Sequence, residues 1–395
     1  MTLLGRRDFL GLGACLAALR PDTASSDALR IGLVTSEGSL TESIRRGAAL
    51  GASEAELFAT MFGKRVELLA RTTTADQTVE TAVRLFREER VAAVIGGSSE
   101  AAAEALQRAA KEASGSFLNV GAMAGRLRGE LADRRTLHVH PGIATLVNAV
   151  GLWLIEQAKR TRWGLIVVES PFGAEVETSA TALARSREAQ VVQRASVPPG
   201  FGDWPAVLGR LHEAKVDAVL VGLEPESVQP LLGRYGASGL PADLAVVTSD
   251  PHYALEAKPS SLAGVWPLVW HKSLERYSAR ELNGRFHRRF EQPLDGVAWA
   301  AWAAVKIVTE AAVRAGSLGV QPVLDFVETR LAFDGHKGAA LSFRESDREL
   351  GQPLYIARPR PGVATGSAEG LEIVAEVSRE KLDAVAQGRR APAEK

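Results

Sequence analysis

The sequence predicts an α/β protein of two doubly wound lobes, each built on a parallel sheet and joined by a three-strand hinge. Two observations support this fold class. Short apolar runs alternate with amphipathic helical segments from residue 29 to 120, and the same alternation returns from residue 142 to 248. Such alternation is typical of parallel strands joined by right-handed helical crossovers. Because the layout occurs twice, without a repeat at the residue level, we expect two similar lobes with a cleft between them.

The first series begins at Leu29–Val34, an apolar run short enough for a buried strand. Its helices carry apolar residues at helical spacing, as at Val79, Ala82, Val83 and Phe86. The expected strands are 29–34, 65–71, 91–95 and 117–120, and the expected helices are 41–62, 75–89 and 99–114.

The second series has the same order of elements. Its expected helices are 142–161, 173–188, 204–214 and 225–235, and its expected strands are 163–168, 190–196, 216–222 and 244–248. Further helices are expected at 278–290, 296–315 and 322–331, further strands at 337–343, 353–357 and 372–377, and a loop at 359–370. We expect lobe 1 to comprise 27–141 and 271–349, lobe 2 to comprise 142–270 and 350–385, and residues 386–395 to form a frayed tail.

The N-terminal stretch reads as an export signal. Arg6 and Arg7 precede an apolar segment of signal-peptide length, and Arg-Arg-x-Phe-Leu resembles the twin-arginine signal. The alternative is an amphipathic N-terminal helix with a chance arginine pair. We expect residues 1–26 to be removed near Ala24-Ser25-Ser26, and a weak lipobox before Cys15 leaves lipidation there as the rival processing site.

Composition excludes several functions. The 395-residue chain has no net charge, so no strong field attracts nucleic acid. Cys15 is its single cysteine, and a product cleaved after it has no disulfide, thiolate nucleophile or cysteine metal site. No later segment is expected to span a membrane, so a soluble mature protein is predicted.

Enzymatic and cofactor motifs are missing from the sequence. No Walker A, HExxH, G-x-S-x-G or G-x-G-x-x-G pattern occurs, so we predict neither an enzyme nor a cofactor. The rival class is a secreted hydrolase with Ser98 or Ser99 as nucleophile, but no base is visible beside these serines. His138 and His140 share one side of an extended segment, and a structural role is favoured there over a metal site.

Candidate ligand contacts come from the loops that follow strands, because parallel strands present their carboxyl ends at one edge of a sheet. Gly97, Ser98 and Ser99 precede a helix and offer backbone N–H groups, although a plain turn with Ser99 as N-cap explains them equally well. The remaining predicted contacts are Gly121, Ala122, Met123, Phe172, Asp203, Trp270 and Trp302. For the aromatic residues, packing inside a lobe is the competing explanation.

Several segments together resemble a known family. They are Val94–Ser99, Val219–Gly222, the helix Ala304–Ser317, Phe333–Gly338 and Leu341–Phe343. The chain resembles, over most of residues 29–357, the type I periplasmic solute-binding proteins of ABC transporters, whose type members bind leucine, isoleucine and valine. The resemblance implies a small-molecule ligand, an ABC permease or another periplasmic partner, and a periplasmic location.

A narrower resemblance rests on Asn119–Ala122, Leu127–Gly129, Leu137-His138 with Pro141, Leu341–Arg344 and Gln352–Leu354. These are similar to the binding proteins encoded with pyrroloquinoline-quinone-dependent alcohol dehydrogenase systems.

The chain departs from the amino-acid binders at two places. Gly121–Ala124 lacks the family's hydroxyl side chains, and Trp302-Ala303 replaces a Tyr-Asp pair. A zwitterion without partners is costly to bury, so we predict a weakly polar ligand. The alternatives are a branched-chain amino acid binder and a ligand-sensing subunit.

Overall fold

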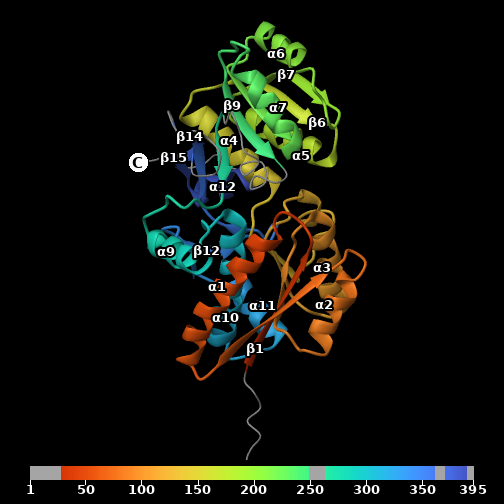
Figure 1. The fold of residues 1–395 in the computed structure, drawn as a ribbon, viewed down its shortest axis with the longest axis vertical. Coiled ribbons are helices and arrows are strands. Elements are labelled where there is room, and N and C mark those ends of the chain that lie inside the picture. The colour runs from red at the N-terminus through yellow and green to blue at the C-terminus, as the bar shows by residue number, and fades with distance from the viewer. Residues whose placement is uncertain (1–27, 249–262, 361–369, 389–395) are drawn as a thin grey trace, which may run out of the picture.

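The computed structural model describes residues 28–248, 263–360 and 370–388, which form two lobes joined at a narrow waist (Figure 1). The predicted export signal and Cys15 lie outside the described residues, as do residues 361–369 of the expected loop 359–370 and residues 389–395 of the expected tail 386–395.

Lobe 1 is built on a parallel sheet in the order β2-β1-β3-β4-β5. Its strands are β1 (Ala28–Ser36), β2 (Arg65–Thr73), β3 (Ala93–Gly96), β4 (Phe117–Asn119) and β5 (Thr136–His138). Leu29, Ile31 and Leu33 face the core on one side of β1, and Val34 faces a second core on the other. Burial on both faces is why β1 and β3 have continuous apolar runs in the sequence.

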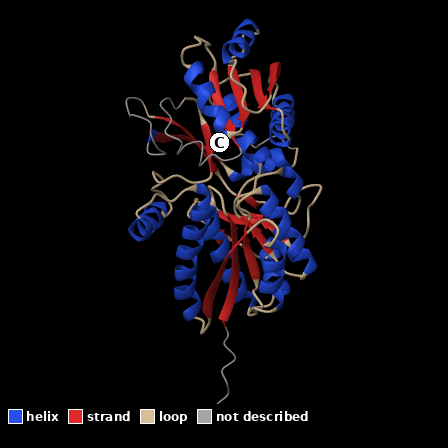
Figure 2. Cartoon of the chain, turned by 45° about the vertical axis from the view of Figure 1, so that its right-hand side comes forward, coloured by secondary structure: helices blue, strands red, loops and turns tan. Residues whose placement is uncertain are grey.

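The helices of lobe 1 cover both faces of this sheet, as a doubly wound fold requires (Figures 1 and 2). One face packs against α2 (Thr78–Arg87) and α3 (Glu100–Glu112), and the other against α1 (Thr41–Thr60) and α10 (Gly296–Ala315). The lobe also contains η1 (Gly125–Leu127), α9 (Ala279–Phe290), α11 (Val320–Thr329) and a small antiparallel sheet of β11 (Phe333–Asp334), β12 (Ala340–Phe343) and β13 (Leu350–Gly351).

Lobe 2 repeats the design with a parallel sheet in the order β7-β6-β8-β9. Its elements are α4 (Ile143–Glu156), β6 (Arg162–Val168), α5 (Pro171–Ser186), β7 (Gln190–Val197), α6 (Trp204–Glu213), β8 (Ala218–Leu223), α7 (Pro225–Tyr235) and β9 (Asp243–Thr248). α4 and α5 pack together on one face, whereas α6 and α7 pack together on the other. The type I periplasmic-binding fold predicted from the sequence is therefore present.

Three parts of the fold differ from expectation. An antiparallel sheet of β10 (Trp266–Leu268), β14 (Leu354–Pro359) and β15 (Leu371–Val377) is attached to lobe 2. A helix, α12 (Arg379–Ala386), follows it and was not predicted, because eight residues with two buried apolar side chains give little periodicity. β12 begins later than the expected strand 337–343, because His336 and Gly338 adopt left-handed backbone angles that interrupt extension.

α10 is long and apolar enough to cross a membrane by length and composition, contrary to the expectation that no such segment follows the signal. Most of it is buried between α1 and α11, so it is the core helix of lobe 1. Asp295 caps it by accepting hydrogen bonds from Val297 N at 2.9 Å and Ala298 N at 2.8 Å.

The chain passes between the lobes at three places, which we call the first, second and third crossings. They run from β5 to α4, from β10 to α9, and from β13 to β14, and they meet at the waist (Figure 1). The lobe boundaries expected at residues 141, 270 and 349 stay a prediction.

A candidate ligand site between the two sheets

A cavity of about 390 Å³ lies between the lobes. Lobe 1 lines it with Leu40, Ser98, Ser99, Glu100, Gly121, Ala122, Met123, Ala124 and Arg126, and the lobe 2 side with Ile143, Pro171, Phe172, Glu175 and Glu224. Six of the ten predicted contacts are among these residues: Ser98, Ser99, Gly121, Ala122, Met123 and Phe172.

The position of the cavity follows from strand order. In lobe 1, β2 is added on one side of β1, and β3, β4 and β5 are added in turn on the other side. The direction of winding therefore reverses between β1 and β3. Lobe 2 reverses between β6 and β8 in the same way. Crevices open at the carboxyl ends of strands where the winding reverses. The two crevices share this one cavity, which is why loops from both sheets line it.

Ser98 and Ser99 have different environments. Ser98 is buried, and its Oγ lies 2.9 Å from Ser36 Oγ. Ser99 is exposed at the start of α3, where its side chain accepts a hydrogen bond from Ala102 N at 3.2 Å. Both readings of Ser99 are therefore compatible with its position, since it caps α3 and also borders the cavity.

Gly97 does not line the cavity, in contrast to the prediction. Its φ of +93° lies in the region that favours glycine, and a Cβ there would meet Asn119 Oδ1 at 2.4 Å. Gly97 instead allows the tight turn that brings Ser98 and Ser99 to the cavity.

The turn after β4 is closed by Asn119. Its Oδ1 accepts hydrogen bonds from Gly121 N at 3.3 Å and Ala122 N at 3.0 Å, and its Nδ2 donates to Ala122 O at 2.7 Å. The backbone N–H groups of Gly121 and Ala122 are thus already bonded within the protein. Met123 and Ala124 add side chains without hydroxyl groups, so this wall of the cavity is apolar.

Lobe 2 contributes an aromatic ring and two carboxylates. Phe172 is half-buried in the first turn of α5, and Glu175 one turn later accepts a hydrogen bond from Gly125 N of lobe 1 at 2.9 Å. Burial raises the pKa of Glu175. Glu224 follows β8 directly, at the point where the winding of lobe 2 reverses. The sequence analysis missed Glu175 and Glu224, although Glu224 could have been found as the first polar residue after the apolar run 216–222.

Asp203, Trp270 and Trp302 do not line the cavity, and the reason differs between Asp203 and the two tryptophans. Asp203 is exposed after the edge strand β7, one strand away from the reversal in lobe 2. Trp270 is buried, stacks on Trp299 and donates from Nε1 to Asn283 Oδ1 at 2.8 Å. Trp302 belongs to the core helix, and its Nε1 donates to Glu54 Oε2 at 3.0 Å. Both tryptophans therefore pack in the core.

His138 and His140 are buried, and burial lowers the pKa of each, that of His140 to about 4. His138 Nδ1 lies 3.0 Å from Asn119 Nδ2, which supports the structural role predicted for it. Within residues 28–248, 263–360 and 370–388, no group of three or more His, Cys, Asp or Glu side chains is placed to hold a metal ion.

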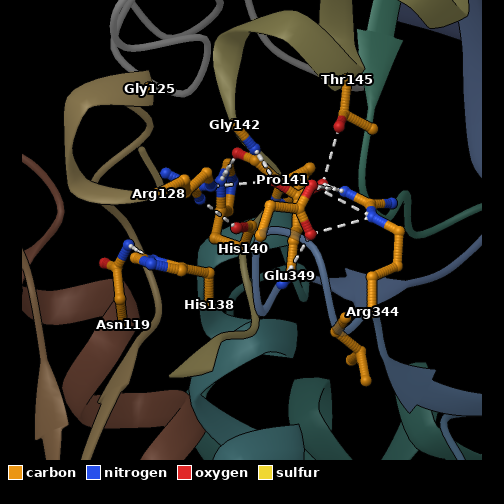
Figure 3. A network of polar contacts seen from close by, with 12 residues as sticks. Asn119, Gly125, Arg128, His138, His140, Pro141, Gly142, Thr145, Arg344 and Glu349 are labelled. Carbon is orange, nitrogen blue, oxygen red and sulfur yellow. Dashed lines mark hydrogen bonds and ion pairs between the residues drawn. The ribbon is translucent and has the colours of Figure 1, made fainter. Parts of the chain in front are cut away.

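A buried ionic cluster at the waist was not predicted (Figure 3). The carboxylate of Glu349 accepts hydrogen bonds from Arg128 Nε at 2.9 Å, Gly142 N at 2.7 Å, Thr145 Oγ1 at 2.7 Å and Arg344 Nη2 at 2.8 Å. Burial by itself would raise the pKa of Glu349, but Arg344 and Arg128 lower it to about 2. The partners are up to 221 residues apart in sequence, so no local spacing indicated the cluster.

Comparison with known proteins agrees with this architecture. A protein-family model described as periplasmic binding protein matches residues 29–366 of this chain. No curated relative matches the chain by sequence. One similar solved structure is a branched chain amino acid ABC transporter periplasmic ligand-binding protein from Burkholderia xenovorans, with 15% identity, a TM-score of 0.82, and coverage of 92% of this chain and 99% of that one.

Two more structures are similar. An ABC-type branched-chain amino acid transporter protein from Rhodopseudomonas palustris has 19% identity, a TM-score of 0.78, and coverage of 93% of this chain and 100% of its own. A leucine-, isoleucine-, valine-, threonine- and alanine-binding protein from Brucella ovis, in a closed conformation, has 16% identity, a TM-score of 0.78, and coverage of 89% and 95%. At these identities the structures show a shared fold, and the family match covers most of the sequence. The chain therefore belongs to the periplasmic binding protein family.

Proposed function

We propose that this protein is the exported substrate-binding component of an ABC transporter, and that it holds a small, weakly polar organic solute between its lobes. Members of its family bind small molecules, act in the periplasm and interact with ABC permeases. The observation that carries the ligand class is the closed turn after β4. Asn119 occupies the N–H groups of Gly121 and Ala122, and no hydroxyl side chain replaces them.

The remaining lining supports the same class of ligand. Leu40, Met123, Ile143 and Phe172 offer an apolar body of the cavity, while Ser98 and Ser99 provide hydroxyl groups at one end. The hydrogen bonds that the structure gives Ser98 Oγ are with Ser36, a hydroxyl and a backbone N–H, rather than with a general base. This arrangement favours binding over hydrolysis. A small alcohol, aldehyde or ketone fits it, which agrees with the sequence resemblance to proteins of quinone-dependent alcohol oxidation.

A branched-chain amino acid is the second candidate. Glu175 and Glu224 bring carboxylates to the lobe 2 side of the cavity, where an ammonium group could pair with them. Proteins of the same fold, from Burkholderia xenovorans and Brucella ovis among others, are named for branched-chain amino acids or leucine.

Isothermal titration calorimetry with a panel of ligands separates these candidates. The panel contains 1-butanol, butanal, 2-butanone, leucine, isoleucine and valine, titrated into protein refolded from denaturant to remove any retained ligand. We expect binding by at least one uncharged compound and none by the amino acids at micromolar concentration. Micromolar binding of leucine, isoleucine or valine would contradict the proposed ligand class.

Two variants connect the result with the cavity. Phe172→Ala removes the aromatic ring of lobe 2 and should weaken binding of the uncharged ligand about tenfold or more, as expected for a lost buried aromatic contact. Ala124→Thr places a hydroxyl group in the turn after β4 and should improve amino acid binding relative to the parent. Phe201→Ala is a matched control, because this half-buried ring packs on Trp204 outside the cavity.

A further inference from the structure

A second buried charged group lies at the waist, apart from the Glu349 cluster. Lys337 is 1% exposed, and its Nζ donates to Val269 O at 2.6 Å, Gln352 Oε1 at 2.8 Å and Pro353 O at 3.2 Å. The same atom lies 4.2 Å from the centre of the Trp299 ring. Three acceptors around one nitrogen match the three donors of an ammonium group, and the aromatic face adds a cation–π contact.

The partners of Lys337 belong to different crossings. Val269 lies on the second crossing, whereas Gln352 and Pro353 lie on the third. Gln352 extends the connection, because its Nε2 donates to Val139 O on the first crossing at 2.9 Å. Lys337 and Gln352 together therefore bond all three chain segments that join the lobes.

The Glu349 cluster does not make the same connection. Its carboxylate binds Gly142 N and Thr145 Oγ1 after the first crossing, and Glu349 itself precedes the third. None of its hydrogen bonds described above reaches the second crossing. Lys337 is thus the charged side chain whose bonds join the second crossing to the third, and through Gln352 to the first.

Burying the amine of Lys337 costs free energy, and side-chain packing alone does not explain why a lysine stands at this position. Burial lowers the pKa of Lys337 well below its usual value, and the negative charge of Glu376 acts against that shift. An apolar side chain of similar length would often be as stable in such a position. Buried polar groups can select one arrangement of the chain, as a buried asparagine fixes the register of some coiled coils. An ammonium with three donors on a flexible stem suits a joint where three backbone segments must keep fixed relative positions.

We infer that Lys337 is a positioning residue that sets the angle between the lobes in the empty protein. Its Nζ and the amide of Gln352 hold the three crossings together, and this geometry fixes how far the cavity is open before ligand arrives. Neither side chain lines the cavity, so Lys337 acts on the site through the lobe angle. This inference rests on the proposed binding function, since the lobe angle matters because the lobes close on a ligand.

Pulsed electron–electron spin resonance on the empty protein tests the inference. The product that begins at residue 27 has no cysteine, so a labelled pair can be added without removing any. Arg108→Cys on α3 and Thr178→Cys on α5 place labels at exposed positions in the two lobes. The distance distribution between the labels is compared among the parent pair, Lys337→Met and Lys306→Met. Lys306 is a matched control, because it is a partly buried lysine of α10 rather than of a crossing.

We expect Lys337→Met to shift and broaden the distribution, and Lys306→Met to leave it unchanged. Gln352→Glu is the second variant and keeps the size of the side chain. It gives Lys337 a charged acceptor and removes the donor to Val139, so it should also shift the distribution while retaining the fold. If both variants fold and both keep the parent distance distribution, the inference is overturned. It is also overturned if Lys337→Met does not fold and the folded Gln352→Glu protein keeps the parent distribution. The measurement uses no ligand, so its outcome is independent of which solute the cavity binds.

Discussion

At the scale of single residues, Glu349 shows how much a buried charge depends on its neighbours. Arg128, Arg344, Thr145 and the backbone of Gly142 all donate to its carboxylate. Removing one partner of a buried ion pair usually costs about 3–5 kcal/mol, because the other charge stays buried and uncompensated. Without Glu349, the buried guanidinium of Arg128 keeps its bonds to the backbone carbonyl groups of Ala124 and His140, and Arg344 keeps its ion pairs with Asp347 and Asp383.

We expect Glu349→Gln to lower the free energy of unfolding by about 3–5 kcal/mol at pH 7. The folded pKa is about 2, below the usual value for a glutamate, so the carboxylate stabilises the fold above pH ~4.3 and loses this contribution as pH falls towards 2. Urea unfolding of both proteins at several pH values should show the gap narrowing over that range. Exposed Glu345→Gln is the control. A gap that stays constant from pH 7 to pH 3 would contradict the assignment.

Sequence reasoning at this scale placed at the cavity the residues of loops that follow strands, whereas the two tryptophans lie away from the cavity. Ser98, Met123 and Phe172 line the cavity because strand ends converge at one edge of a sheet, and ligand contact by them stays a prediction. Trp302 was misplaced, because a tryptophan on a core helix and a tryptophan in a cleft have the same spacing in sequence. Only the tertiary fold shows that its face of α10 turns towards Glu54 and His336.

At the scale of secondary-structure elements, the contact between α1 and α10 depends on small residues. A Cβ at Gly47 would lie 2.0 Å from Ala298 O, and one at Gly51 would lie 2.9 Å from Trp302 O. The two helices approach closely because these glycines have no side chain. Ser43 Oγ strengthens the same contact by donating to the capping residue Asp295 at 2.7 Å.

We expect Gly47→Ala to destabilise lobe 1 by about 1–3 kcal/mol, the usual cost of overpacking, because the new methyl group forces the helices apart. Gly209→Ala in α6 is the matched control, since a Cβ there meets nothing within 4 Å. That change should instead stabilise the protein by up to about 1 kcal/mol through helix propensity. Thermal unfolding followed by circular dichroism gives both values. Equal effects of the two substitutions would contradict this packing.

Most strands and helices were predicted close to their observed bounds, and α7 and α10 have the bounds expected from the sequence. Their apolar periodicity and flanking Pro, Asp and Gly residues made them clear. The antiparallel sheet of β10, β14 and β15 was not predicted as a unit. β10 has only three residues, and the residues of β14 that pair with them are 87 to 91 positions later in the chain, so the pairing leaves no local trace.

At the scale of the whole molecule, the sequence predicts export to the periplasm through the signal that contains Arg6 and Arg7. We expect Arg6→Lys combined with Arg7→Lys to leave the precursor in the cytoplasm, because the twin-arginine receptor reads both arginines. Immunoblots of cytoplasmic and periplasmic fractions measure this, with Arg20→Lys as the control. Undiminished periplasmic protein in the double variant would exclude the twin-arginine route.

The stacked tryptophans at the waist have one more consequence. Trp270 lies near the start of the second crossing and Trp299 lies in the core of lobe 1. The centres of their rings are 5.9 Å apart, and the ring planes are 12° from parallel. The Lys337 amine sits 4.2 Å from the Trp299 ring centre. The fluorescence of an indole ring depends on nearby charges and on stacked rings. A small rotation of the lobes should therefore change the emission wavelength and quantum yield of these tryptophans. Intrinsic tryptophan fluorescence should therefore report movement between the lobes without an added dye.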